Sequence, residues 1–354
     1  MATIYSPLKF LRYQEQLNAL REGRLVAPVH VRIKPTNMCN HNCWYCAYRN
    51  DNLHLGEDMD ERDQIPHAKM QEIVADLVAM GVKAVTFSGG GEPLLYKPLP
   101  ETIEQLAEGG ISVATLTNGA NLKGKVAEAL ARHATWVRVS VDAWDDESYA
   151  TARGAKAGEF TRLLENVRAF TNSGTRCVLG VSLIVGQNNY QHIPDVCRQF
   201  RDAGANHVKI AAVVVGNTVE KNNEYFHAFV EDAKPYLAEA LAMSRPNFQV
   251  LDHFHEMADR FEKPYTTCPF LQFLTIIGAD LNVYTCQDKA YTAEGLLGSI
   301  KNCRFRDYWF SEENARSLQS LDPSTNCRHH CVSHRKNLSI LEYLDLDDEH
   351  GAFV

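Results

Sequence analysis

The stretch Cys39-Asn40-His41-Asn42-Cys43-Trp44-Tyr45-Cys46 carries three thiols within eight residues, and the rest of the chain is organised around it. Residues 30–35 (HVRIKP) before it are predicted to form a short strand, and residues 36–38 a loop. The thiols are therefore expected on a loop at the carboxyl end of a strand, where α/β proteins place their chemistry.

Three closely spaced thiolates can hold zinc or an iron-sulfur cluster. A closed structural zinc site needs four ligands, whereas a 4Fe-4S cluster held by three protein thiolates keeps one iron open for another molecule. The spacing C-x3-C-x2-C, with Tyr45 before the last cysteine, resembles the signature of the radical S-adenosylmethionine (SAM) superfamily. The resemblance implies that Cys39, Cys43 and Cys46 hold a catalytic 4Fe-4S cluster, that the open iron chelates SAM, and that Tyr45 is a cofactor-binding residue. One electron would then release a 5'-deoxyadenosyl radical that takes hydrogen from the substrate. A zinc ribbon is the alternative.

The bulk properties narrow the class of protein. A chain of 354 residues favours one large domain and a smaller one. A formal charge of -8 gives no electrostatic footprint for nucleic acid, no apolar run approaches the roughly 20 residues that span a bilayer, and the start has no secretory apolar region. We expect a cytoplasmic protein that binds neither nucleic acid nor membrane. Its ten cysteines cluster toward the two ends of the chain, which suggests metal sites rather than a disulfide framework.

After the cysteine loop, predicted strands and helices alternate. Strands are predicted at residues 84–87, 111–116, 136–141, 176–185 and 207–215, and helices near 70–80, 98–108, 123–132, 160–170 and 190–203. With the strand before the cysteines this makes six parallel βα units, which fit a partial barrel or an open doubly wound sheet. The family resemblance selects an α/β fold with a partial (β/α)6 TIM-type barrel.

The expected organisation has three parts. Residues 1–29 are predicted to be a helical extension, with a helix over residues 7–25 that caps the fold, and residues 30–245 the barrel. Residues 246–354 are predicted to form a small α+β auxiliary-cluster domain. It would contain an isolated strand at 248–252, a β-hairpin over 273–284 and a helix near 305–318.

The residues after the second strand, Ser88-Gly89-Gly90-Gly91-Glu92-Pro93, suit a polar ligand. Glycines let the backbone approach a ligand closely, and Glu92 offers an anionic acceptor to an ammonium group. The stretch resembles the family's Gly-Gly-Glu motif, near whose glutamate the methionyl amino group of SAM is received. The resemblance therefore implies cofactor-binding roles for Gly90, Gly91 and Glu92; an ordinary glycine-rich turn is the alternative.

Polar residues also follow the later strands. Asn118, Ser140 and Ser182 can hydrogen-bond ribose hydroxyls or a carboxylate. Residues 142–160 resemble the branch of the family with auxiliary clusters, in which an arginine neutralises the SAM carboxylate; here that residue would be Arg153. Each of these side chains could instead serve a turn or a helix cap.

A second group of thiols lies in the expected small domain. Cys268 and Cys286 stand at opposite ends of the predicted hairpin, and Cys327 and Cys331 complete a set of four, which fits zinc or a fully ligated iron-sulfur cluster. The arrangement resembles the SPASM and twitch domains, and the number of cysteines implies one auxiliary 4Fe-4S cluster. Cys177 and Cys197 are expected in the core. Cys303 is assigned no role. The alternatives for this thiol are a hydrogen donor and a substitute cluster ligand.

A fully ligated second cluster has no open iron, so we expect it to transfer electrons. By resemblance to twitch enzymes that act on aminocyclitols and sugars, we expect oxidation (dehydrogenation) or epimerisation of a small polyol-like molecule, with an electron donor such as flavodoxin or ferredoxin. Peptide or protein side-chain modification is an alternative, although only 38 residues precede Cys39 to hold a leader-binding domain. A non-catalytic iron-sulfur or zinc sensor or scaffold is the alternative from another class, and Gly90, Gly91 and Glu92 argue against it.

Overall fold

The computed structural model describes residues 4–49, 53–254, 260–347, 349 and 353, and within them ten strands form one sheet. The strands are β1 (His30–Ile33), β2 (Ala84–Phe87), β3 (Ser112–Thr117), β4 (Ala134–Ser140), β5 (Val178–Val185), β6 (His207–Ala212), β7 (Gln249–His253), β8 (Leu274–Ile277), β9 (Asn282–Tyr284) and β10 (Leu296–Ser299). Their order across the sheet is β10-β9-β8-β1-β2-β3-β4-β5-β6-β7.

The α-helices follow the strands along the chain. They are α1 (Gln14–Arg21), α2 (His67–Met80), α3 (Leu99–Glu108), α4 (Gly124–His133), α5 (Asp146–Arg153), α6 (Glu159–Thr171), α7 (Ile193–Asp202), α8 (Val219–His227), α9 (Val230–Ala242), α10 (Phe305–Trp309), α11 (Glu312–Ser320), α12 (Pro323–Asn326) and α13 (His334–Leu344). Within the described residues, no helix combines the length and the apolar character that crossing a bilayer requires.

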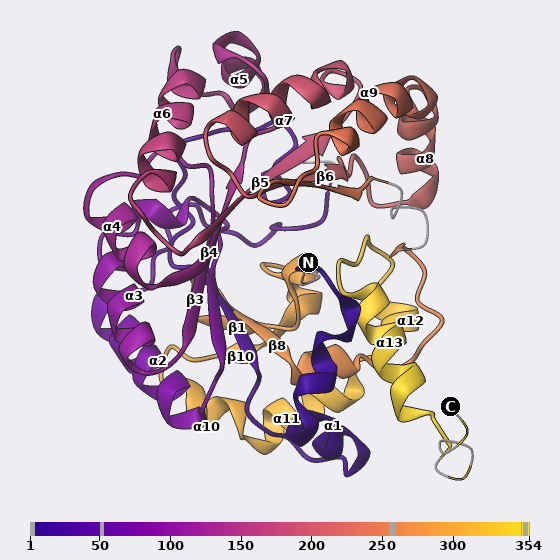
Figure 1. The fold of residues 1–354 in the computed structure, drawn as a ribbon. Coiled ribbons are helices and arrows are strands. Elements are labelled where there is room, and N and C mark those ends of the chain that lie inside the picture. Colours follow the sequence, from indigo (N-terminus) through magenta and orange to yellow (C-terminus); the bar gives the residue numbers. More distant parts are fainter. Residues whose placement is uncertain (1–3, 50–52, 255–259, 348, 350–352, 354) are drawn as a thin grey trace.

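The first six strands lie side by side in the order of the sequence, and each neighbouring pair is parallel. A doubly wound sheet contains a point where the strand order reverses, whereas this order carries the crossovers to one side of the sheet. In Figure 1, helices α2, α3, α4 and α6 accordingly form an arc outside the strands, and the N-terminal segment and α13 lie on the concave side. The structure confirms the partial barrel.

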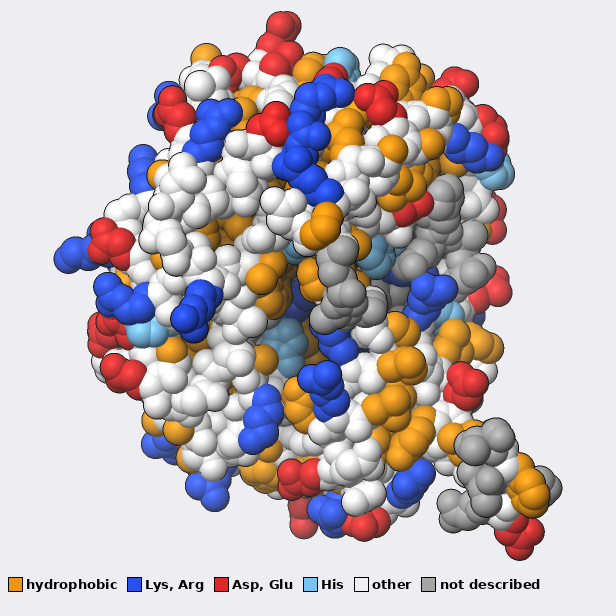
Figure 2. Space-filling model, in the orientation of Figure 1, with side chains coloured by type: hydrophobic (Ala, Val, Ile, Leu, Met, Phe, Trp, Pro, Cys, Tyr) orange, Lys and Arg blue, Asp and Glu red, His pale blue; other side chains and the backbone are white. Residues whose placement is uncertain are grey.

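The concave side of the sheet is polar, and we call the space that it encloses the lumen. Side chains alternate between the two faces of a strand, so Arg32 of β1 and Arg138 of β4 alternate with buried Val31, Ile33, Val137 and Val139. Figure 2, drawn from the side of Figure 1, shows a hollow near the centre of this face, with His and Lys or Arg side chains inside it.

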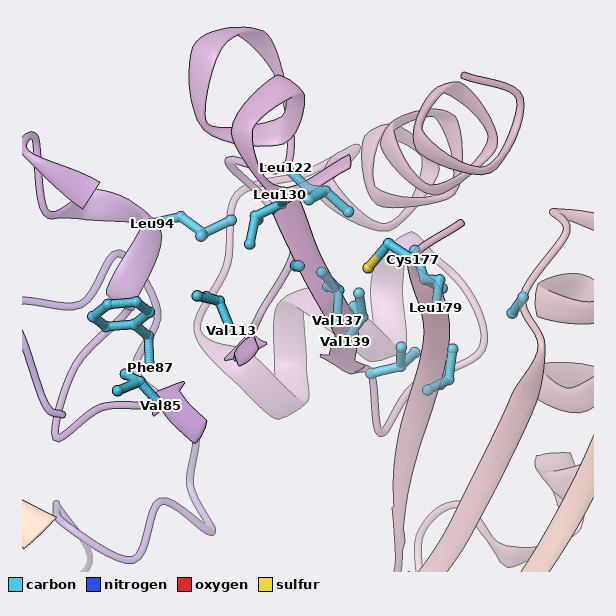
Figure 3. Close-up of a cluster of buried hydrophobic side chains, with 14 of the residues drawn as sticks. Val85, Phe87, Leu94, Val113, Leu122, Leu130, Val137, Val139, Cys177 and Leu179 are labelled. Atoms are coloured by element: carbon cyan, nitrogen blue, oxygen red, sulfur yellow. The ribbon is translucent and has the colours of Figure 1, made fainter. Parts of the chain in front are cut away.

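The convex side of the sheet forms the main hydrophobic core. Val85, Phe87, Val113, Val137 and Leu179 come from four adjacent strands and are buried against the helix layer. Figure 3 shows these side chains together with side chains from the connecting segments, such as Leu122 and Leu130. This packing leaves the carboxyl ends of the strands and the lumen to the polar side chains.

The segment after residue 245 departs from the prediction, because its strands extend the barrel sheet. The strand expected at 248–252 is not isolated: it is β7, which pairs in parallel with β6 through Val208 and Val250. The predicted hairpin is present as β8 and β9, and β8 pairs in parallel with β1. Both additions follow from the unpaired backbone groups that an open barrel leaves at its two edges. The domain boundary at 245 stays a prediction.

Two predicted helices are interrupted. The helix expected at 7–25 consists of the 3-10 helix η1 (Pro7–Arg12) and α1, separated by Tyr13. The helix expected at 305–318 is divided into α10 and α11, because Ser311 caps α11 by accepting a hydrogen bond from the amide of Asn314. Helices α5, α8, α9, α12 and α13 have no counterpart in the sequence prediction.

Candidate active site

The cysteine loop follows β1 and is fastened to the end of α5. Cys39, Cys43 and Cys46 are all half-buried, and the amide of Cys46 donates to the carbonyl of Cys43 at 3.1 Å. The amide of Asn42 donates to the carbonyl of Arg153 at 2.7 Å. The three thiols therefore lie at the carboxyl end of a parallel strand, as the sequence predicted.

The glycine-rich segment after β2 runs beside the cysteine loop. The amide of Glu92 donates to the carbonyl of Met38 at 2.8 Å. A Cβ atom on Gly91 would lie 2.0 Å from that carbonyl oxygen, and one on Gly90 would lie 2.5 Å from Oδ1 of Asn37. Close backbone approach was expected for a ligand; in the structure it serves the contact between this segment and the loop that carries Cys39.

The Glu92 carboxylate is buried and accepts three hydrogen bonds. They come from Oγ1 of Thr117 at 2.6 Å, the amide of Asn118 at 2.7 Å and the amide of Leu94 at 3.0 Å. Burial raises the pKa of Glu92, and these hydrogen bonds oppose the rise. The Asn118 amide group in turn donates to Oδ1 of Asn40 at 2.9 Å. Glu92 and Asn118 thus join the end of β3 to the cysteine loop, while their contact with SAM stays a prediction.

Asp142 is the residue at the centre of the site that the sequence prediction did not assign. It follows β4 with a left-handed φ of 58°, and its carboxylate is buried. The carboxylate accepts hydrogen bonds from the Tyr45 hydroxyl at 2.6 Å, Nη2 of Arg153 at 2.6 Å and the amide of Ile184 at 2.5 Å. Aspartate tolerates a left-handed backbone better than most residues, which suits it to this position. The signal in the sequence that could have identified Asp142 was its position directly after a strand.

Arg153 connects Asp142 to the first cysteine set. It is 3% exposed, and its Nε donates to the carbonyl of Val141 at 2.9 Å. Its Nη1 lies 3.8 Å from Sγ of Cys43, and its guanidinium lies 5.9 Å from the centre of the Tyr45 ring. Burial raises the pKa of Cys43, and the Arg153 charge opposes that rise. Neutralisation of the SAM carboxylate by Arg153 stays a prediction.

A cavity of about 660 Å³ opens beside the cysteine loop. Trp44, Tyr45, Asp142, Ile184 and Val213 are among its lining residues, which come from the loop and from the ends of β4, β5 and β6. Its volume lies within the range of small-molecule and cofactor sites.

Ser140 and Ser182, predicted to bind the cofactor, lie opposite each other on β4 and β5. Both are half-buried and alternate with side chains that enter the convex core, so they point toward the lumen. Lys34, which follows β1, was not predicted as a site residue. It donates to the Tyr48 hydroxyl at 2.7 Å and to the carbonyl of Gly89 at 3.1 Å. Burial and the charge of Arg32 lower the pKa of Lys34 to about 7.

The structure brings the four distal cysteines together. Burial raises the pKa of Cys286, and negative charge at Asp288, Cys331, Cys268 and Cys327 raises it further. Cys268 also receives a hydrogen bond: Nδ2 of Asn337 on α13 lies 3.3 Å from its Sγ. A donor to a thiolate sulfur is a contact that adjusts an iron-sulfur cluster.

The distances between possible ligand atoms can be compared with those of a closed zinc site. Among the described residues, only Cys286, Asp288 and His329 bring three possible ligand atoms within 4.8 Å of one another. Neither cysteine set is therefore closed around a single ion, as a zinc site with bonds of about 2.3 Å would be. Asp288 and His329 were not predicted at the second site.

The remaining cysteines behave as expected. Cys177 and Cys197 are buried in the main core. Cys303 is exposed on the loop after β10, and its carbonyl accepts a hydrogen bond from Lys69 of α2, in the outer helix layer. This thiol therefore lies outside the sheet, away from the lumen.

Comparison with known proteins gives one family match and several related sequences. The radical SAM superfamily model matches residues 33–213, more than half of the chain. A GTP 3',8-cyclase of Rhizobium etli is 25% identical over 208 residues, which cover 58% of this chain and 57% of the relative. A probable GTP 3',8-cyclase of Metallosphaera sedula is 23% identical over 283 residues, covering 78% of this chain and 81% of the relative. The alignment with the Rhizobium etli protein thus spans little more than half of that relative's length.

Solved structures share the fold at low sequence identity. Streptococcus suis SuiB bound to S-adenosylmethionine gives a TM-score of 0.64 at 16% identity and covers 90% of this chain and 75% of that chain. The protein anSMEcpe with bound AdoMet gives a TM-score of 0.58 at 15% identity and covers 90% of this chain and 96% of that chain. At these identities the likeness concerns the fold, and it agrees with a partial barrel followed by an antiparallel region.

Proposed function

Because this chain belongs to the radical SAM superfamily, we propose that Cys39, Cys43 and Cys46 hold the catalytic 4Fe-4S cluster and that the adjacent cavity of about 660 Å³ receives SAM. When bound, these cofactors supply a 5'-deoxyadenosyl radical that removes a hydrogen atom from the substrate. The observation that carries the proposal is the linkage of Cys43, the middle thiol of the three, through Arg153 and Asp142 to Tyr45 at the cavity wall.

The chain's own residues prepare this site. Arg153 places a positive charge beside Cys43, which favours the thiolate that a cluster requires. Asp142 holds the Tyr45 hydroxyl and the end of β5 together at the cavity wall. Gly90 and Gly91 allow the segment before Glu92 to pack on the loop. The cysteine loop is held by hydrogen bonds to Arg153, Glu92 and Asn118. These contacts keep its thiols in position without the metal, which lowers the entropy cost of assembling the cluster.

The second cysteine set supports an oxidation. We propose that Cys268, Cys286, Cys327 and Cys331 would hold an auxiliary 4Fe-4S cluster, which would supply an acceptor for one electron. In the oxidation of a carbinol the hydrogen atom leaves carbon, an electron leaves the radical, and the hydroxyl proton goes to a base, giving a carbonyl. A flavodoxin or ferredoxin would exchange the electrons.

Oxidation is favoured over epimerisation by the place of Cys303. Epimerisation returns a hydrogen atom to the substrate and needs a donor at the lumen. Cys303 is exposed on the far side of the helix layer, next to Lys69, so it does not reach a substrate there.

For the substrate we propose a small, hydroxylated, sugar-like molecule. The two cavities beside and inside the lumen, of about 660 and 350 Å³, have the volumes of small-molecule sites. The relatives named GTP 3',8-cyclase and S-adenosylmethionine-dependent nucleotide dehydratase support a nucleotide within that class. Modification of a peptide is the second candidate; its support is the likeness to SuiB, solved bound to precursor peptide SuiA, and that likeness concerns the fold.

The proposal is tested by SAM cleavage in anaerobically reconstituted protein reduced with dithionite. We expect the wild type to release 5'-deoxyadenosine, and a variant with Cys39, Cys43 and Cys46 changed to Ala to release none. The matched control is Cys303→Ser, which removes an exposed thiol and should retain cleavage. An iron-loaded wild type that does not cleave SAM would leave the sensor or scaffold as the better description.

A further inference from the structure

We propose that the lumen holds an oxyanion group of the substrate, a phosphate or a carboxylate, between Arg32 of β1 and Arg138 of β4. The proposed site takes the ligand to be the substrate, and in this respect it rests on the function proposed above. It starts from a cavity of about 350 Å³ inside the barrel, distinct from the one beside the cysteine loop. Residues that line this inner cavity include His30, Arg32, Thr86, Ala114, Arg138 and Lys336.

The sheet itself creates the space. Arg32 pairs in register with Thr86, and Thr86 pairs with Ala114, so small side chains separate β1 from β4 on the concave face. Arg138 lies two residues before Ser140 at the end of β4. At about 3.3 Å per residue, its Cα is about 7 Å below the strand end. An anion held here would leave the rest of a small substrate extending toward the cysteine loop.

Neither arginine forms an ion pair with a carboxylate among the described residues, although the charge of Asp288 is near enough to Arg32 to raise the pKa of that guanidinium. The guanidinium of Arg32 makes no hydrogen bond or ion pair with any of them, and its Nε is shielded from solvent. Arg138 donates from Nη1 to the Tyr5 hydroxyl at 3.3 Å, but its Nε is likewise shielded and without a partner. Both residues are half-buried, and shielding a charged group from water without a partner is costly, so we expect an occupant that satisfies both guanidinium groups.

Buried arginines elsewhere in this chain are paired with carboxylates. Arg153 donates to Asp142 at 2.6 Å, and the mostly buried Arg49 lies 3.1 Å from Glu61. Arg32 and Arg138 differ from them, because no described carboxylate lies within ion-pair distance of either guanidinium. A substrate that brings the anion itself would complete the pattern.

The other groups around the cavity agree with an anionic ligand. Lys336 on α13 faces Arg32, and burial together with the Arg32 charge lowers the pKa of Lys336 to about 8. His30 shares a hydrogen bond with Thr86 at 2.8 Å, and burial and the Arg32 charge lower its pKa to about 3, so it is neutral. The chain carries a net charge of -8, yet the hollow in Figure 2 exposes Lys or Arg side chains. Such a site concentrates anions by its local field.

Guanidinium groups define the ligand chemistry. Their planar fork donates two parallel hydrogen bonds to a phosphate or carboxylate, which an ammonium group cannot do. Phosphorylated sugars, nucleotides and sugar acids share this group. Pyrophosphate and citrate serve as probes that separate the phosphate class from the carboxylate class.

The test is calorimetric titration of the reconstituted holoenzyme with pyrophosphate and, separately, with citrate at constant ionic strength. We expect saturable binding of at least one probe, weakened about tenfold or more in Arg32→Gln and in Arg138→Gln, because each loses a charge-assisted hydrogen bond. Arg32→Lys should fall between Arg32→Gln and the wild type. The matched control is Arg132→Gln, at an exposed arginine on α4, which should bind like the wild type.

The outcomes separate this inference from the proposed function. A wild type that cleaves SAM but binds neither probe, or binds with equal strength after both glutamine substitutions, overturns the oxyanion site and leaves the radical chemistry standing. A wild type that binds pyrophosphate through Arg32 and Arg138 but does not cleave SAM retains the site and removes the radical chemistry. Iron content, measured on each variant, confirms that the barrel is assembled.

Discussion

Asp142 is the single residue on which most of the candidate site depends. It accepts hydrogen bonds from Tyr45, Arg153 and the amide of Ile184, so one carboxylate joins the cysteine loop, α5 and β5. It does so with a left-handed φ of 58°, a conformation that costs free energy in a residue other than glycine. The hydrogen bond that it accepts from Arg153 holds that guanidinium beside Cys43.

Removal of this carboxylate is the first prediction. Asp142→Ala leaves the Arg153 charge buried and unpaired, and we expect a loss of about 3–5 kcal/mol in the free energy of unfolding. Urea titration followed by tryptophan fluorescence measures it. The matched control is Asp195→Ala, which breaks a half-exposed ion pair with Arg198 on α7 and should cost about 0.2–1 kcal/mol. Equal losses in the two variants would contradict the account of Asp142.

The second prediction concerns Gly91, in the segment that packs on the cysteine loop. A Cβ atom on Gly91 would lie 2.0 Å from the carbonyl oxygen of Met38, so Gly91→Ala should displace the cysteine loop and lower the iron retained at the first site. The control is Gly110→Ala, where φ is +77° and the space is open, so its cost of about 1–2 kcal/mol is backbone strain alone. Iron analysis after reconstitution checks both variants. Full iron retention in Gly91→Ala would show that the loop tolerates the displacement.

Among the elements, helix α13 connects the two parts of the proposed reaction. Lys336 faces the lumen cavity, and the next residue, Asn337, donates to Sγ of Cys268 at 3.3 Å. Asn337 also accepts a hydrogen bond from the amide of Phe270 at 2.9 Å, which holds the chain next to Cys268. One helix thus contacts both the lumen cavity and the second cysteine set.

The third prediction concerns Asn337. Asn337→Asp retains an acceptor for the Phe270 amide but loses the donor to Cys268, and it adds a negative charge. Both changes disfavour the reduced, more negative cluster, so the midpoint potential of the second cluster should fall. A redox titration followed by electron paramagnetic resonance measures it, with the first cluster in the same sample as internal control. An unchanged or higher potential would show that this hydrogen bond does not adjust the cluster.

The fourth prediction is the pH dependence of anion binding. The pKa of Lys336 is lowered to about 8 by burial and by Arg32, so Lys336 loses its proton as the pH rises through 8. Binding of an anion must restore that proton. Affinity for sulfate, which does not titrate in this range, should therefore fall between pH 7 and pH 9 by up to about tenfold per pH unit above 8. Arg32 remains charged at these pH values, because its pKa is about 10, and His30 remains neutral.

Calorimetric titration with sulfate at pH 7, 8 and 9 checks this dependence. Lys336→Gln should bind more weakly at pH 7 and show little change with pH. If the wild type and Lys336→Gln have the same pH dependence, Lys336 does not take part in anion binding.

At the scale of the whole molecule, the sequence predicted the barrel because local patterns determine it. Each βα unit carries its own apolar strand and amphipathic helix, and the cysteine motif identifies which strand comes first. The edges of the sheet were not predictable in the same way. Strand β7 pairs with β6 and β8 pairs with β1, and these pairings depend on which strands the barrel leaves open rather than on the residues of β7 and β8.

For the candidate site, too, the residues with a local signal in the sequence were predicted and those placed by long-range contacts were not. Single residues after strands, such as Glu92 and Asn118, carry a local signal in the sequence. Asp142 gave a weaker one, and the pairing of Arg153 with it arises only when α5 packs on the loop. Asp288 follows Cys286 by two residues, so its nearness to that thiol is local, whereas His329 lies near Cys286 because of contacts made across the fold. The roles of the predicted site residues stay predictions until cofactors are bound.

The most direct test of the account is the iron and sulfide content of anaerobically reconstituted protein, combined with electron paramagnetic resonance before and after addition of SAM. The wild type is compared with the variant in which Cys39, Cys43 and Cys46 are Ala, and with Cys303→Ser as control. We predict about eight irons in the wild type and the control, about four in the triple variant, and a spectrum that SAM changes only where the three cysteines are present. Zinc in place of iron at the first site, or a response to SAM that survives in the triple variant, would contradict the account.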